Sequence, residues 1–144
     1  MSSNPPKSLV VAAIQLTSTP QLDANLSRVV AHLEEAKSMG VDLAVLPENF
    51  AFLGSEQAKL AYAQDLQTGA IVEFLKNHAA RLEMGIVAGG LPEKGPDAEH
   101  VYNTSVFMGR DGNILGSYRK IHLFDIDLEN QITYRESACV VPGD

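Results

Sequence analysis

Two residues of opposite charge each follow an apolar stretch of this 144-residue chain. Glu48 comes directly after the apolar run at residues 41–46 and Pro47, which stops that run. Lys120 follows a second strand-like stretch at residues 114–118. A carboxylate held in place acts as a general base, and a fixed ammonium stabilises an oxyanion as it develops. The ordinary alternative for each residue is a solvated surface charge.

The elements around Glu48 predict where it lies. Residues 8–16 and 41–46 are apolar and partly β-branched, which indicates buried strands, and residues 23–39 carry apolar side chains at helical spacing. Such a strand–helix–strand unit pairs its two strands in parallel through a right-handed crossover. Ligands of open α/β sheets bind at the carboxyl ends of the strands, so this unit puts Glu48 at a functional edge.

The rest of the chain continues with helices and strands as far as Lys120. Asp23 is the expected cap of the first helix and Gly40 its expected stop. The further elements that we expect are a weakly patterned helix at 55–67, a helix at 68–83 ended by Gly85, a strand at 85–90, a polar loop at 92–100, strands at 101–108 and 114–118 joined by a hairpin turn, irregular chain from 121 to 136, and the start of another strand at 137–141.

The sequence contains one further candidate catalytic carboxylate and one candidate cation site. Glu136 is a third candidate carboxylate, and otherwise an ordinary loop acid. An acidic cluster follows Lys120 and has oxygen ligands suited to a hard cation. Its spacing is not that of a calcium loop, so we expect no metal and no cofactor. The members of this cluster are His122, Asp125, Asp127 and Glu129.

Cys139 is the single cysteine of the chain. A nucleophilic cysteine needs a lowered pKa, supplied by a helix N-terminus, a cation or a nearby base. Cys139 lies instead in a short apolar run, residues 138–141. Neither a tight glycine turn nor the start of a helix follows it. We therefore expect a small buried hydrophobe at this position.

The composition excludes several classes of partner. The formal net charge is −7, and no basic cluster or basic face is visible, which disfavours binding to nucleic acid or to an anionic membrane. No apolar run approaches the length of a membrane span, and residues 1–8 lack the apolar core of a signal peptide. One cysteine permits no internal disulfide and fits a reducing compartment, so the expected location is the cytoplasm.

Three stretches, taken together, resemble the nitrilase superfamily of carbon–nitrogen hydrolases. They are residues 46–50 (LPENF), 118–125 (YRKIHLFD) and 136–144 (ESACVVPGD), and residues 103–104 (NT) also fit the family pattern. The resemblance runs from about Leu9 to the last residue. Residues 15–20 and 47–52 look most like the nitrilase-like amidases of the deaminated glutathione amidase type, whereas residues 120–127 suit the ω-amidase branch equally well.

The resemblance implies a chemistry. Family members hydrolyse a non-peptide amide through a glutamate–lysine–cysteine triad and a thioester acyl-enzyme. By resemblance, Glu48 is the general base, Lys120 stabilises the oxyanion, and Glu136 is an auxiliary glutamate that orients the site. The expected partners are a small, carboxylate-bearing amide and water, and the parent protein is expected to be a homodimer or a larger homo-oligomer.

The chain departs from the family pattern at its end. The family nucleophile lies beyond the turn represented by residues 142–144, so we expect the nucleophilic cysteine to be absent from this chain, with Cys139 not replacing it. The expected fold class is α/β, the N-terminal half of a four-layer α-β-β-α nitrilase-type sandwich that is incomplete at the C-terminus. Residues 1–7 are expected to be a loose tail, and residues 8–144 the N-terminal part of a single carbon–nitrogen hydrolase domain.

These expectations lead to a prediction for the isolated chain. It should be inactive alone and only marginally folded, because strands without their neighbours expose edges and an apolar sheet face. Two alternatives remain open at this point. One is a non-catalytic, truncated module that binds a metabolite or a partner, and the other is metal-dependent hydrolysis through the acidic cluster.

Overall fold

The main element of the fold is a five-stranded sheet with the strand order β1-β2-β3-β4-β5. The computed structural model describes residues 8–128 and 132–144, so the tail expected at residues 1–7 lies outside the described part. β1, β2 and β3 are parallel, whereas β3, β4 and β5 are antiparallel. The strands are β1 (Val11–Ala13), β2 (Leu43–Leu46), β3 (Gly85–Lys94), β4 (Val101–Met108) and β5 (Ile114–Arg119).

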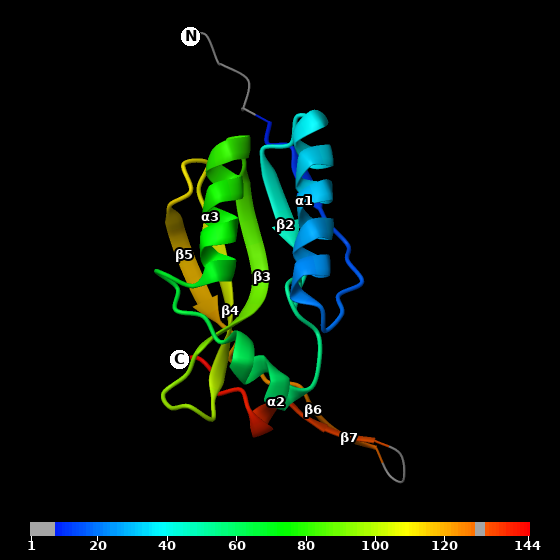
Figure 1. Cartoon of the computed structure of the whole chain (residues 1–144), viewed down its shortest axis with the longest axis vertical. Helices are drawn as coiled ribbons and strands as arrows, with labels where there is room; N and C mark the ends of the chain where they lie inside the picture. Colours follow the sequence, from blue (N-terminus) through cyan, green and yellow to red (C-terminus); the bar gives the residue numbers. More distant parts are fainter. Residues whose placement is uncertain (1–7, 129–131) are drawn as a thin grey trace, which may run out of the picture.

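Two long helices lie on one face of this sheet (Figure 1). They are α1 (Leu22–Ser38), which connects β1 to β2 and confirms the predicted parallel unit, and α3 (Ala70–Leu82). The helix predicted at 55–67 is shorter, because only α2 (Glu56–Lys59) and a 3₁₀ turn at Leu60–Tyr62 form there. None of the helices in the described part is long and apolar enough to cross a membrane.

Alternation along the strands separates a covered face from an uncovered one. Ala44, Ile86 and Met108 are neighbours across β2, β3 and β4, and all three are fully buried. Val87 and Phe107 pair on the opposite face, where Phe107 is 38% exposed. Successive side chains of a strand point to opposite faces of the sheet. One set of apolar side chains therefore lies under the helices, and the other set lies on the uncovered face.

Helix ends follow the sequence signals only in part. α1 begins after Gln21, which makes no side-chain cap bond, so the prediction of Asp23 as the cap is wrong. Asp23 lies in the first turn, where its negative charge interacts favourably with the helix dipole. Gly40 follows α1 with φ +74°, which agrees with the predicted stop. α3 ends with Glu83 at φ +46°, and Gly85, the stop predicted for it, is the first residue of β3.

β3 is longer than predicted. The polar loop expected from residue 92 is wrong at its start, because Pro92 to Lys94 continue the strand and pair with β4. The register shifts between Ala88 and Leu91, where Gly90 has φ +68°. A glycine in the left-handed region allows the strand to bulge and then resume pairing. The sequence predicts that the strand ends at residue 90, because glycine usually interrupts a strand.

The segment after Lys120 differs most from expectation. In place of irregular chain it contains an antiparallel hairpin of β6 (Asp125–Leu128) and β7 (Ile132–Arg135). The strand predicted at 137–141 is also wrong, because a 3₁₀ turn at Glu136–Ala138 and an isolated bridge from Val101 to Val140 take its place. β6 carries exposed carboxylates and no buried side chain, so the local pattern gave no strand signal.

The covered face should dominate the stability of the fold. Leu75 on α3 is fully buried, whereas Leu115 on β5 is 62% exposed. Replacing Leu75 with Ala should lower the free energy of unfolding by about 3 kcal/mol, and the matched change Leu115→Ala by less than about 0.5 kcal/mol. Urea unfolding followed by circular dichroism measures both values. Equal losses in the two variants would contradict the assignment of the core.

Candidate active site

Glu48 lies just beyond the carboxyl end of β2, on a sharp turn of the chain. Asn49 has φ +57°, and its N–H donates to the carbonyl oxygen of Gly90 at 3.1 Å. A Cβ added at Gly90 would lie 2.9 Å from Cγ of Glu48 and would also meet Oδ1 of Asn103. Glycine at position 90 is therefore required for the close approach of β3 to Glu48.

Lys120 follows the end of β5 and reaches Glu48. Its backbone N–H donates to the carbonyl oxygen of Asn103 at 2.8 Å, which continues the pairing of β5 with β4. Its Nζ lies 3.1 Å from Oε1 of Glu48 and 2.9 Å from Oε2 of Glu136. The structure therefore brings together all three residues that the sequence singled out for the site.

Glu136 is the buried member of this group. Its side chain is 3% exposed, and its Oε2 accepts the N–H of Phe124 at 2.6 Å in addition to the bond from Lys120. Burial raises the pKa of Glu136, but the bonds from the Phe124 amide, Lys120 and Asn103 outweigh burial and hold the pKa below its ordinary value. Glu136 is therefore a fixed negative charge at neutral pH.

Asn103, in the middle of β4, bridges the two carboxylates. Its Nδ2 donates to Oε1 of Glu48 at 2.5 Å and to Oε1 of Glu136 at 3.2 Å. Asn103 fits the family pattern, but the sequence alone assigns it no role. The available signal was its position as a polar residue within the apolar strand at 101–108.

The two carboxylates around Lys120 differ in access. Burial lowers the pKa of Lys120, but its hydrogen bonds to Glu136 and Glu48 outweigh burial and raise the pKa above the ordinary value. Lys120 therefore remains an ammonium. The side chain of Glu48 is 49% exposed, so Glu48 is the carboxylate of the pair that a second molecule is able to reach.

Cys139 has the properties of a packed side chain. It is buried, and its Sγ donates to the carbonyl oxygen of Glu56 at 3.2 Å. Burial raises the pKa of its thiol above the ordinary value, which is the opposite of what a nucleophile needs. The expectation of a buried hydrophobe is confirmed at this position.

The acidic residues after Lys120 bind their own segment. Asp125 accepts bonds from the N–H and the hydroxyl of Ser137 at 3.0 and 2.6 Å. Asp127 accepts the hydroxyl of Thr133 at 3.1 Å, and Glu129 lies outside the described residues. Across residues 8–128 and 132–144, no group of three or more His, Cys, Asp or Glu side chains is arranged to hold a metal ion.

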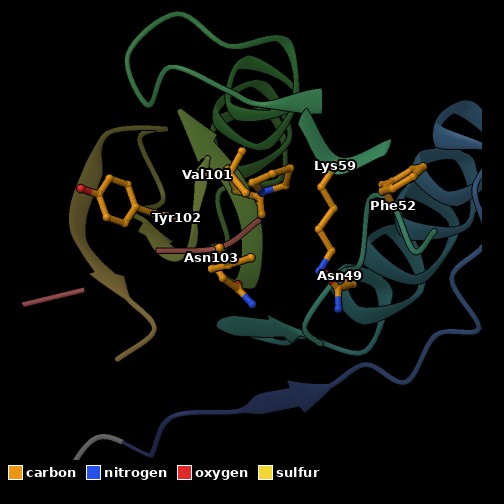
Figure 2. Close-up of a pocket in the computed structure, with 9 residues that line it drawn as sticks. Asn49, Phe52, Lys59, Val101, Tyr102 and Asn103 are labelled. Carbon is orange, nitrogen blue, oxygen red and sulfur yellow. The ribbon is translucent and has the colours of Figure 1, made fainter. Parts of the chain in front are cut away.

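A small pocket lies beside Asn103, the residue that bridges Glu48 and Glu136 (Figure 2). Asn49 and Asn103 line it together with apolar side chains and the buried Lys59 of α2. Its interior volume of about 10 Å³ is room for about one water molecule. This pocket is too small for an organic ligand, and Glu48 is not among the residues that line it.

Comparison with known proteins connects this arrangement to one family. Residues 10–144 match the family model described as carbon-nitrogen hydrolase. The chain is 41% identical over 138 residues to a deaminated glutathione amidase of Synechocystis sp. (strain PCC 6803), a match that covers 95% of this chain and 50% of the relative. It is 36% identical over 140 residues to the omega-amidase NIT3 of Saccharomyces cerevisiae, covering 93% of this chain and 48% of the relative.

Solved structures agree with the sequence matches. The NitFhit protein of C. elegans superposes with a TM-score of 0.82 at 28% identity, over 93% of this chain and 33% of that protein. A mutant of the amidase from Nesterenkonia sp. AN1, which carries acrylamide added to its active site cysteine, gives a TM-score of 0.78 at 25% identity, over 95% of this chain and 50% of that amidase. The chain thus spans about half the length of the curated relatives it matches.

The ion pair of Glu136 with Lys120 should make the stability of the fold depend on pH. The pKa of Glu136 is lower in the folded chain than its ordinary value of 4.5, so its contribution is present above pH 4.5 and is lost as the pH falls through the lowered value. Glu136→Gln should cost about 3 kcal/mol at neutral pH, and the cost should shrink as the solution is acidified toward about pH 3.

Urea unfolding at a series of pH values measures this cost. Glu99→Gln is a matched control, because Glu99 is an exposed loop carboxylate. A difference between the wild type and Glu136→Gln that stays constant from neutral to acid pH would show that Glu136 is not an ionised partner of Lys120.

Proposed function

We propose that this chain, which belongs to the carbon–nitrogen hydrolases of the nitrilase superfamily, supplies the acid–base and oxyanion-binding residues of an amidase. The observation that carries the proposal is the ammonium of Lys120, which lies between an accessible carboxylate, Glu48, and a buried one, Glu136. The reaction is hydrolysis of an amide to a carboxylic acid and either ammonia or an amine, according to whether the amide nitrogen carries a substituent.

Glu48 is the proposed general base. It takes the proton of a cysteine thiol, and the thiolate forms a bond to the carbonyl carbon of the substrate. The same proton then passes to the amide nitrogen, the C–N bond breaks, and ammonia or an amine leaves, with the acyl group held as a thioester. Glu48 next takes a proton from water, whose oxygen attacks the thioester. The C–S bond breaks, the acid is released, and the proton on Glu48 returns to the thiolate. The turn that holds Glu48 at the end of β2 supports this role.

Lys120 is the proposed stabiliser of the oxyanion. An ammonium has three donors, of which one bonds to Glu136 and one to Glu48 in this structure. When Glu48 becomes protonated, it attracts Lys120 less strongly, and the ammonium is available to the oxygen that gains negative charge. Glu136 is the proposed auxiliary glutamate, because its buried charge keeps Lys120 in place throughout.

The proposed nucleophile comes from a segment C-terminal to residue 144. Cys139 does not suit the role, since it is buried and bonded to the backbone of Glu56. The amidase from Nesterenkonia sp. AN1 has an active site cysteine, and the chain spans only about half of that protein. In the proposal, the same segment completes the four-layer α-β-β-α sandwich and covers the open sheet face at Val87 and Phe107.

The proposed substrate is a small amide that carries a carboxylate. Deaminated glutathione is the first candidate, because the relative named for that activity is 41% identical to this chain. An α-keto acid amide is the second candidate, because the omega-amidase of Saccharomyces cerevisiae is 36% identical. A non-catalytic module that only binds such a metabolite is the alternative, and it predicts binding without hydrolysis of the amide.

The proposal includes a place and an assembly for the complete protein. We propose a cytoplasmic enzyme, since the single cysteine fits a reducing compartment. We also propose that the complete protein is a homodimer or a larger homo-oligomer. Light scattering coupled to size exclusion tests the assembly, and a monomeric mass at working concentration would contradict it.

Two substitutions test the roles in a product of the reading frame that extends past residue 144. Glu48→Gln and Lys120→Ala should each lower kcat by at least about 100-fold, because each removes a group that acts in the transition state. Release of cysteinylglycine from deaminated glutathione and of ammonia from α-ketoglutaramate measures the rate, and circular dichroism checks the fold. Glu99→Gln is the control, and wild-type rates in either test variant would refute the assigned role.

The 144-residue chain alone should hydrolyse neither amide. The physical reason is that no accessible thiol lies beside Glu48 among the described residues. Cys139→Ser should change nothing in this assay. Hydrolysis by the 144-residue chain that Cys139→Ser abolishes would overturn the proposal that the nucleophile comes from elsewhere.

A further inference from the structure

A second ion pair lies close to the proposed site and has no role in the chemistry described so far. Nζ of Lys59 lies 2.8 Å from Oε1 and 2.9 Å from Oε2 of Glu56, and the Lys59 side chain is only 7% exposed. Burying two charges costs desolvation energy, which offsets the attraction between them. Stability alone therefore does not account for a buried pair. Glu73 and Lys76 form a pair with the same spacing and the same 2.8 Å distance on α3, but both are far more exposed.

Glu56 also binds the segment that carries Glu136. The hydroxyl of Tyr134 donates to Oε1 of Glu56, and Sγ of Cys139 donates to its carbonyl oxygen at 3.2 Å. Burial, followed by the bond to Glu56, raises the pKa of Tyr134, so its hydroxyl remains a donor. Residues 134 and 139 are thus fixed to a single residue of α2, and Glu136 lies between the two attachment points.

This attachment matters because of where the segment lies. The β6–β7 hairpin extends away from the main sheet, and the segment of Glu136 continues directly from it beside α2 (Figure 1). Figure 2 shows Lys59 extending from α2 into the pocket that Asn49 and Asn103 line. The pair therefore stands between the base of a projecting hairpin and the amide that bridges Glu48 to Glu136.

We propose that Glu56, Lys59 and Tyr134 are positioning residues that fix Glu136 and, through it, the ammonium of Lys120. Lys59 holds the carboxylate of Glu56 in place, Glu56 holds the hydroxyl of Tyr134, and Tyr134 fixes β7 two residues before Glu136. The proposal that these residues place Glu136 rests on the contacts in this structure and not on the proposed function. The effect on turnover rests on the proposed function.

The amide of Phe124 reports the placement of Glu136 without any assay of activity. Its N–H donates to Oε2 of Glu136 at 2.6 Å, the oxygen that also holds Lys120. If Tyr134→Phe or Glu56→Gln loosens Glu136, exchange of the Phe124 amide with deuterium should become about tenfold faster. The amide of Ile86 in the buried part of β3 should keep its wild-type rate.

Nuclear magnetic resonance of the labelled protein measures both exchange rates. Tyr118→Phe and Glu73→Gln are the matched controls, because Tyr118 is exposed and Glu73 lies in the comparable pair on α3. The controls should leave the Phe124 amide unchanged. An unchanged Phe124 rate in Tyr134→Phe and Glu56→Gln, or an equal rise at Phe124 and Ile86, would overturn the proposal, since the latter reports general destabilisation.

Kinetics of the extended product give the second readout. Tyr134→Phe and Glu56→Gln should each lower kcat about tenfold with KM within about twofold, and the double variant should be no slower than the worse single one. A rise in KM at constant kcat would overturn the positioning role. If the extended wild type hydrolyses no amide, the proposed function fails, while the exchange of Phe124 still decides the placement of Glu136.

Discussion

The arrangement of this chain depends on the two ion pairs that the ammonium of Lys120 forms with Glu48 and Glu136. They join the end of β2, the end of β5 and the turn after β7, three segments that are distant in sequence. A carboxylate as buried as that of Glu136 is tolerable only beside a cation and several donors. Lys120, Asn103 and the backbone of Phe124 together meet that requirement.

The same cation serves two carboxylates in different ways. Glu136 is enclosed and bonded to the backbone of Phe124, so its position is fixed by the fold. Glu48 is half-exposed, so a molecule that arrives from solvent is able to contact it. Asn103 donates to both carboxylates and so links the exposed one to the buried one.

Sequence patterns predicted the parts of the structure that follow local rules. The parallel unit and the positions of Glu48 and Lys120 came from apolar runs that end at charged residues, and the structure places the two side chains together. Asn103 received no role, because nothing local shows that a mid-strand amide will face two carboxylates across the sheet. The β6–β7 hairpin was missed for a related reason: Tyr134 holds it to Glu56, a contact between segments that no window spans.

The irregularity at Gly90 changes which residues of β3 face the core. Before it, Ile86 and Ala88 are buried; after it, Leu91 and Glu93 are, so the parity of the buried residues reverses along one strand. Leu91 nevertheless belongs to the same apolar core as Ile86 and Ala88. The single extra residue of the bulge therefore keeps Leu91 in that core, while the missing side chain of Gly90 leaves room for Glu48, so one local irregularity serves both the packing of the sheet and the geometry at its end.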